Sequence, residues 1–396
     1  MIKNILQSVY KNLYKYAYKL NISNNHILSR KYYSSEKIFE LEKSRLFFRH
    51  WIFLAITSEL SDEKSWVVKN ICGTEVLLTR DGDNYYAHQN ICPHKNIRLC
   101  DEEKGTRPLT CKYHAWSFNL DGSNKRVPLE DKSYKFNNRQ KSCKNLKTYE
   151  IEKIGVFLFV KIKKSSIRIQ DQFEPYVLKS LKLISNYFDN RIISYKEKRN
   201  FNWKLNFENL RDALHPAVLH SKSLSKEVDF TAQYDEIPPV YEKRVWLRLP
   251  YASSFSNDGG YKGSDSFDTL ASKGIKPLFN EGYFNWLLFP NFHMASPNAG
   301  RQFNIEFLNP ISSKCVEVTH IFIMQKSSFS NKEIEDELEA YRVAGRKILE
   351  EDYWAVESVQ KGLEFSEIEQ NVGAYEYWNL NIANLYKRII HRWFIF

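Results

Sequence analysis

The sequence lacks any apolar run long enough to cross a bilayer. Its longest apolar stretches, Trp51–Ile56 and Val156–Val160, are far shorter than the roughly 18 residues that a membrane-spanning helix needs. Residues 1–35 contain no apolar core of the kind found in secretory signals. We therefore expect a cytoplasmic protein with no membrane span. Residues 1–35 also lack Asp and Glu and carry six Lys or Arg, so an organelle-targeting segment is the alternative.

The sequence also lacks blocks of like charge. Its 58 Lys and Arg outnumber 47 Asp and Glu, but the basic residues are scattered among acids. A nucleic-acid-binding tail would concentrate them, so we expect no nucleic-acid partner. Only 14 Gly and 12 Pro occur among 396 residues, which excludes a collagen-like or low-complexity chain. The length predicts two or three domains of roughly 100–200 residues.

Residue patterning predicts β structure over residues 46–165 and a mixture of helices and strands over residues 166–396. Glu75–Thr79 and Tyr85–His88 flank the turn at 81–84, which is typical of a hairpin. Apolar spacing predicts helices at Asn206–His220 and Lys332–Leu363 and an N-terminal helix with a stripe from Ile2 to Leu20. Further strands are expected at 155–161, 245–249, 283–289, 303–308 and 316–324, and a loop at 252–268.

Cysteine is scarce, with six residues in the whole chain. In a reducing compartment, clustered Cys and His indicate a metal site rather than disulfides. Two short pairs stand out, Cys92-Pro93-His94 and Cys111-Lys112-Tyr113-His114. Each places one thiolate and one imidazole near the end of an expected strand, so two loops could face each other. The residues alone permit a structural zinc site or a Rieske [2Fe–2S] centre.

These two pairs resemble the Rieske domain of the Rieske non-haem iron oxygenases. That resemblance implies a [2Fe–2S] cluster with the ligands Cys92, His94, Cys111 and His114. The family usually has Arg-Gly after the first His, where this chain has Lys95-Asn96, and Gly after the second His, where it has Ala115. Neither change removes a ligand, although the surroundings of a cluster tune its potential.

A second group of metal-binding residue types surrounds His215 and His220. Their five-residue separation does not fit one face of a regular helix, but Pro216 disturbs the helix and could bring the two rings together. Asp212 lies three residues before His215, within reach of its ring. Two His and one carboxylate form the facial triad of non-haem Fe(II) oxygenases.

The third ligand must come from elsewhere in the chain, and Glu350, Glu351 and Asp352 are the candidates. Helical periodicity aims Asp352 into an apolar stripe formed by Ile348, Val356, Val359 and Leu363. A carboxylate in such a place is costly unless it is paired or bound to a metal. We therefore predict that Asp352 is the third iron ligand.

The segments 208–220 and 351–360 are similar to the catalytic domain of the same family. The resemblance implies an α+β protein, in which an all-β antiparallel Rieske domain precedes a larger catalytic domain with an antiparallel sheet flanked by helices. We expect an N-terminal helical extension over residues 1–45, the Rieske domain over 46–165 and the catalytic domain over 166–396.

The resemblance also implies a terminal oxygenase that uses O₂ and electrons from a ferredoxin or flavin reductase. In a homotrimer, Asp212 would bridge the iron ligand His215 and a cluster His of the neighbouring subunit. The reaction would be hydroxylation, dihydroxylation or oxidative demethylation of a small organic molecule. Asp rather than Glu at position 212 favours an aromatic substrate, as in aromatic hydrocarbon catabolism. The alternatives are oxidation of a quaternary amine and an electron-transfer iron–sulfur protein without oxygenase activity.

Overall fold

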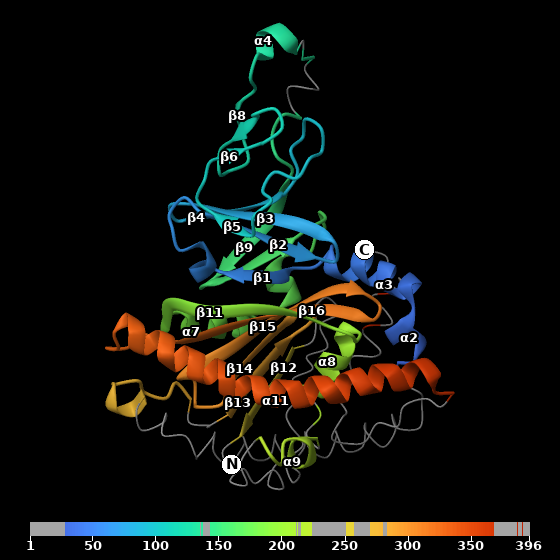
Figure 1. The fold of residues 1–396 in the computed structure, drawn as a ribbon, viewed down its shortest axis with the longest axis vertical. Coiled ribbons are helices and arrows are strands. Elements are labelled where there is room, and N and C mark those ends of the chain that lie inside the picture. Colours follow the sequence, from blue (N-terminus) through green and yellow to red (C-terminus); the bar gives the residue numbers. More distant parts are fainter. Residues whose placement is uncertain are drawn as a thin grey trace.

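The computed structural model describes residues 28–134, 136–137, 143–210, 212, 215–223, 251–256, 270–279, 283–367, 386 and 390. Among these residues the strands form three sheets, and every strand pair is antiparallel. Helices lie against the six-stranded sheet (Figure 1). The α+β fold class predicted from the sequence is confirmed.

The first domain is built on a seven-stranded sheet. Its order is β1 (Ile52–Ile56), β10 (Phe157–Lys161), β9 (Thr148–Ile154), β4 (Asn84–Gln89), β3 (Thr74–Asp81), β2 (Trp66–Ile71) and β5 (Lys104–Gly105). The predicted hairpin is confirmed, because Asp81 pairs with Asn84 where β3 turns into β4. A small sheet of β6 (Leu109–Thr110), β7 (Ser117–Phe118) and β8 (Asn124–Arg126) extends toward the tip, which ends in α4 (Glu130–Ser133) (Figure 1).

The second domain is built on a six-stranded sheet. Its order is β11 (Phe188–Arg199), β16 (Cys315–Gln325), β15 (Gln302–Ser312), β14 (Phe292–Ser296), β13 (Tyr283–Leu288) and β12 (Tyr251–Ser256). One face is apolar and packs against the first sheet, with Phe53 of β1 in edge-on contact with Phe292 and Phe307. The long helix α11 (Asn331–Phe365) crosses the sheet (Figure 1). Its N-terminus is fixed by a reciprocal capping box between Ser330 and Glu333.

The remaining helices are short. They are α2 (Lys31–Ser34), α3 (Glu36–Glu42), the π-helix η1 (Lys43–Phe47), the 3₁₀-helix η2 (Thr57–Leu60), α6 (Ile169–Gln172), α7 (Pro175–Ser185), α8 (Trp203–Asn209) and α9 (His215–Leu219). No helix within the described ranges combines the length and apolarity needed to traverse a bilayer.

Several element predictions need correction. The single helix expected over Asn206–His220 is two helices, α8 and α9, with Pro216 in the first turn of α9, where its missing N–H removes no helical bond. The expected loop at 252–268 begins inside β12, and the rest of it lies outside the described residues. Val359, assigned to the apolar stripe of α11, is 43% exposed. The predicted strand at 245–249 and the N-terminal helical stripe also lie outside the described residues.

Candidate functional site

The two Cys/His pairs occupy two turns of the same construction. The amide of Asn96 donates to the carbonyl of Cys92, and the amide of Ala115 donates to the carbonyl of Cys111, each at 3.0 Å. Asn96 and Ala115 close these turns with φ of +57° and +55°. Glycine adopts such angles without strain, which explains why the oxygenases that this segment resembles usually have Gly at both positions.

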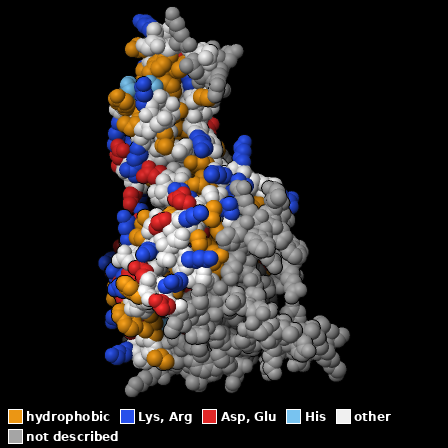
Figure 2. All heavy atoms as spheres, turned by 90° about the vertical axis from the view of Figure 1, so that its right-hand side faces the viewer, with side chains coloured by type: hydrophobic (Ala, Val, Ile, Leu, Met, Phe, Trp, Pro, Cys, Tyr) orange, Lys and Arg blue, Asp and Glu red, His pale blue; other side chains and the backbone are white. Residues whose placement is uncertain are grey.

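The four side chains of these turns lie in two layers. Cys92 and Cys111 are buried and lie close enough for their thiols to interact. Burial, together with the proximity of Cys111, raises the pKa of Cys92 to about 12. The rings of His94 and His114 lie closer to the surface, with centroids 4.5 Å apart. Figure 2 shows histidine near the upper end of the molecule, beside hydrophobic and basic side chains.

This arrangement fits a cluster of two irons better than one zinc ion. A single ion needs all its ligand atoms close together. Within the described part of the chain, only His215, His220 and Asp352 bring three such atoms within 4.8 Å of one another. Two buried thiols beneath two outer imidazoles match a Rieske cluster, in which the Cys hold one iron and the His hold the other.

Aromatic residues support the outer layer. The indole of Trp116 stacks on the ring of His94 at 5.0 Å, with the planes only 3° apart. The hydroxyl of Tyr134 lies 3.3 Å from Nε2 of His94. Burial, and then the charge of His114, lower the pKa of His94. His94 is therefore held in place as a neutral imidazole, the form in which histidine binds metals.

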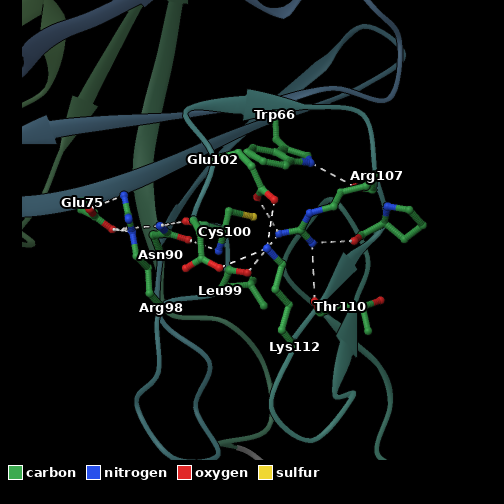
Figure 3. Close-up of polar contacts among 12 residues, drawn as sticks. Trp66, Glu75, Asn90, Arg98, Leu99, Cys100, Glu102, Arg107, Thr110 and Lys112 are labelled. Carbon is green, nitrogen blue, oxygen red and sulfur yellow. Dashed lines mark hydrogen bonds and ion pairs between the residues drawn. The ribbon is translucent and has the colours of Figure 1, made fainter.

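A network of charged side chains ties the two cluster turns together (Figure 3). The guanidinium of Arg107 donates to the carbonyl of Leu99 at 3.3 Å and to the carboxylate of Glu102 at 3.1 Å. Lys112, in the second turn, pairs with Glu102 at 2.9 Å and with Asp101 at 3.1 Å. The network therefore crosses from the segment after the first turn to the second turn itself.

The second centre is formed by residues far apart in the sequence. Nε2 of His215 lies 3.4 Å from Oδ1 of Asp352, and Nε2 of His220 lies 3.1 Å from the same oxygen. The two rings can meet despite their five-residue spacing, because α9 ends at Leu219 and His220 follows in a turn. The side chain of Asp352 comes from α11 and is largely buried. Two imidazoles and one carboxylate thus converge, as a facial triad for Fe(II) requires.

Other side chains hold these three in place. Oε2 of Glu351 lies 2.8 Å from Nδ1 of His220, and the amide of Asn209 donates to Oδ1 of Asp352 at 2.8 Å. Glu350 instead pairs with Arg199 at 2.6 Å. The sequence offered Glu351 only as a rejected ligand candidate, whereas the structure places it behind His220. The one sign of this role in the sequence is that Glu351 directly precedes the predicted ligand Asp352.

The electrostatics of this group favour a cation. Burial would raise the pKa of Asp352, but the hydrogen bonds from His215 and His220 lower it to about 2. Burial would lower the pKa of His220, but its contacts with Asp352 and Glu351 raise it. The carboxylate is therefore ionised and lies beside imidazoles that bind protons. A metal ion would take the place of those protons and be held by the same three side chains.

Asp212 lies near His215, as predicted, but not in hydrogen-bond contact. Its Oδ2 is 3.8 Å from Nδ1 of His215, and that ring nitrogen has no hydrogen-bond partner among the described residues. A distance of this size is an ion-pair distance rather than a hydrogen bond. The carboxylate nevertheless lies on the side of His215 that faces away from Asp352.

Comparisons with known proteins agree with both centres. The family "Rieske [2Fe-2S] domain" matches residues 50–150, and the family "Ring hydroxylating alpha subunit (catalytic domain)" matches residues 186–379. The chain is 25% identical to a carnitine monooxygenase oxygenase subunit of Acinetobacter baumannii over 84% of each chain. It is 26% identical to the large oxygenase component of a salicylate 5-hydroxylase of Ralstonia over 48% of each.

Solved structures share the fold. A quaternary ammonium Rieske monooxygenase in complex with L-carnitine superposes with a TM-score of 0.68 at 20% identity, covering 91% of this chain and 95% of that one. A naphthalene 1,2-dioxygenase from Rhodococcus gives a TM-score of 0.71 at 15% identity, covering 94% and 96%.

Proposed function

The chain belongs to the Rieske non-haem iron oxygenases, and from that premise we propose that it oxidises a small quaternary amine. As a terminal oxygenase component it uses a Rieske [2Fe–2S] cluster and a mononuclear Fe(II). The choice of substrate is supported by the carnitine monooxygenase subunits, which are similar over 84% of this chain. An aromatic substrate is the second candidate, favoured by the similarity to a salicylate 5-hydroxylase.

In this proposal each centre is held by the residues described above. Cys92, His94, Cys111 and His114 would hold the cluster, and His215, His220 and Asp352 would hold the iron. When bound, the cluster supplies single electrons and the iron supplies the chemistry of O₂ activation. The protein orients the ligands through Glu351 and Asn209 and keeps the ionised Asp352 away from water. We also propose that residues 1–45 form the N-terminal extension, residues 46–165 the Rieske domain and residues 166–396 the catalytic domain.

Electron transfer between the centres would cross a subunit boundary. The cluster turns adjoin β6 near the upper end of the molecule, whereas α9 lies near the opposite end (Figure 1). A neighbouring subunit in a homotrimer could instead place its cluster beside Asp212, which already stands behind His215. A ferredoxin or flavin reductase in the cytoplasm would supply the electrons.

The observation that carries the proposal is the convergence of His215, His220 and Asp352 within 4.8 Å. The test measures O₂ uptake of the reconstituted protein with a reductase and L-carnitine, glycine betaine or salicylate as substrate. His215→Ala should abolish substrate-dependent uptake and lose the mononuclear iron, while the visible absorbance of the cluster persists. Loss of that absorbance would argue against two separate centres.

The bridging role of Asp212 needs its own test. Asp212→Asn removes the charge and keeps the size of the side chain. Both metals should remain bound, while the rate at which the reduced cluster is reoxidised in the presence of substrate and O₂ should fall by orders of magnitude. Unimpaired reoxidation would contradict the bridge.

A further inference from the structure

A buried tyrosine near the N-terminal end of the described residues contacts the helices that carry the iron site. Tyr33 lies on α2 and is 2% exposed. Both α2 and α8 pack against α11, and the three helices lie together in Figure 1. α11 carries the candidate iron ligand Asp352, and α8 carries Asn209, which donates to it at 2.8 Å. Tyr33 therefore lies among the elements that set the position of this ligand.

The helix α8 is held against α11 at both of its ends. At its N-cap, the backbone N–H of Asn202 donates to Oε1 of Gln360 at 2.9 Å. At its C-terminal end, the side chain of Asn209 donates to Asp352. The contacts are seven residues apart on α8 and eight apart on α11, which is roughly 10–12 Å along each helix. The two helices therefore run antiparallel, and a shift at either end of α8 would move Asn209 relative to Asp352.

Tyr33 contacts both ends of α8. Its carbonyl oxygen accepts from the side chain of Asn202 at 3.3 Å and from that of Gln360 at 3.4 Å. Its hydroxyl donates to Oε1 of Glu208 at 2.6 Å. The carbonyl belongs to the backbone and is kept in any substitution of the side chain. A variant that lacks the hydroxyl therefore changes the contact with the C-terminal end of α8 and leaves the N-terminal contacts in place.

The hydroxyl of Tyr33 holds the least buried part of α8. The first five residues of the helix, Trp203–Phe207, are buried, whereas Glu208 and Asn209 are half-buried. The last turn of a helix frays readily, because its carbonyl groups lack helical partners. A length of 2.6 Å is typical of the strong hydrogen bonds that a hydroxyl donates to a carboxylate. By fixing Glu208, the hydroxyl keeps the next residue, Asn209, directed at Asp352.

We propose that Tyr33 is a positioning residue for the iron site, acting through Glu208 and Asn209 on Asp352. This role rests on the proposed oxygenase function and adds to it a contribution from residues ahead of the Rieske domain. The NH₂ group of Asn209 is a hydrogen-bond donor and not a metal ligand, so its bond to Asp352 persists when iron binds. Without the hydroxyl, the carboxylate is less well ordered before iron binds, and ordering it then opposes binding.

The test measures the dissociation constant of Fe(II) for the protein with an intact, oxidised cluster. Tyr33→Phe removes the hydroxyl and keeps the ring. This variant should bind Fe(II) about tenfold more weakly than the wild-type protein, the lower end of the range for side chains that support a metal ligand. The EPR spectrum of the mononuclear iron with nitric oxide should also broaden, because a less ordered carboxylate gives a spread of ligand geometries.

Tyr32→Phe is the matched control for Tyr33→Phe. Tyr32 is the neighbouring buried tyrosine of α2, and its ring packs edge-on against Tyr386 at 5.8 Å, a contact that phenylalanine keeps. The control should bind Fe(II) as tightly as the wild-type protein. Cluster absorbance and the midpoint of thermal unfolding report whether each variant is intact.

A double-mutant cycle tests whether the hydroxyl acts through Glu208. Glu208→Gln keeps an oxygen that can accept from Tyr33, so it should retain most of the iron affinity. Glu208→Ala removes the acceptor and should weaken iron binding about as much as Tyr33→Phe does. Combining Tyr33→Phe with Glu208→Ala should then cause no further loss, because residues in direct contact are not additive.

Two results would overturn the role of Tyr33. One is wild-type iron affinity with an unchanged EPR spectrum in Tyr33→Phe. The other is an equal loss of affinity from Tyr33→Phe with and without the Glu208 carboxylate, as expected for a general loss of stability. Weaker iron binding by Tyr33→Phe, without any substrate-dependent O₂ uptake by the wild-type protein, would instead contradict the oxygenase function and leave the role of Tyr33 standing.

Discussion

At the scale of single residues, three neighbouring acids on α11 have three different partners. Asp352 meets His215 and His220, Glu351 supports His220, and Glu350 pairs with Arg199. The sequence could separate Asp352 from the others because helical periodicity placed it on the inner face. It could not assign Glu351, because that role depends on where the turn after α9 places the ring of His220.

Glu351→Gln should weaken iron binding without affecting the cluster. Glu351 accepts from the ring N–H of His220, and losing such a partner of a metal-bound His typically lowers metal affinity about 10–100-fold. Iron titration followed by metal analysis measures the effect, with cluster absorbance as an internal reference. Glu350→Gln is the control, since Glu350 contacts Arg199 instead. Equal iron affinity in both variants would show that Glu351 does not support the site.

Cys111→Ser should remove the visible absorbance of the cluster. Serine replaces the thiolate with a hydroxyl, a poor ligand for an iron–sulfur cluster. Cys143→Ser, which changes an exposed cysteine outside the turns, should remain coloured. Optical spectra and sulfide analysis decide the outcome, and a Cys111 variant that stays brown would move the cluster ligands elsewhere.

At the scale of elements, the motif segments were predictable because their residues are close in sequence. Long strands that are rich in charged residues were not predictable in this way. β11 spans Phe188–Arg199 and ends in four charged residues, Lys-Glu-Lys-Arg, of which Lys and Glu are depleted in strands. It forms because it pairs over much of its length with β16, a partner more than a hundred residues later. Such a tertiary contact overrides local preference.

The second cluster turn offers a stability test. Ala115 adopts a positive φ of +55°, which costs an L-residue roughly 1–2 kcal/mol. Ala115→Gly relieves that strain, and the gain exceeds the roughly 0.4–1 kcal/mol of added freedom in the unfolded chain. The midpoint for thermal bleaching of the cluster should therefore rise. Ala87→Gly, in the buried part of β4, should lower it, and a fall in both variants would contradict the strain argument.

At the scale of the whole molecule, acid should destabilise the fold through His50. His50 is buried between η1 and β1, with Nδ1 2.9 Å from the carbonyl of Leu46. Burial lowers its pKa to about 4, against about 6.5 in an unfolded chain. Below pH ~6.5 the unfolded state therefore binds a proton that the folded state does not, and the free energy of unfolding falls by up to about 3 kcal/mol as the pH approaches 4.

Urea unfolding at several pH values between 7.5 and 4.5 measures this loss. His50→Asn cannot titrate, so its free energy of unfolding should change less with pH than that of the wild-type protein. His88, whose pKa burial also lowers, remains in both proteins and cancels in the comparison. Parallel pH profiles for variant and wild type would exclude His50 as the source.

The buried carboxylate of Glu42 joins three distant parts of the chain. Glu42 ends α3, pairs with Lys204 of α8 at 2.6 Å and accepts a hydrogen bond from Tyr386. The same short helix α8 carries Asn209, which bonds to Asp352. Limited proteolysis that removes Tyr386 would leave this charge pair short of a partner. Because α8 carries both Lys204 and Asn209, the loss would also disturb the hydrogen bond that holds the candidate iron ligand Asp352.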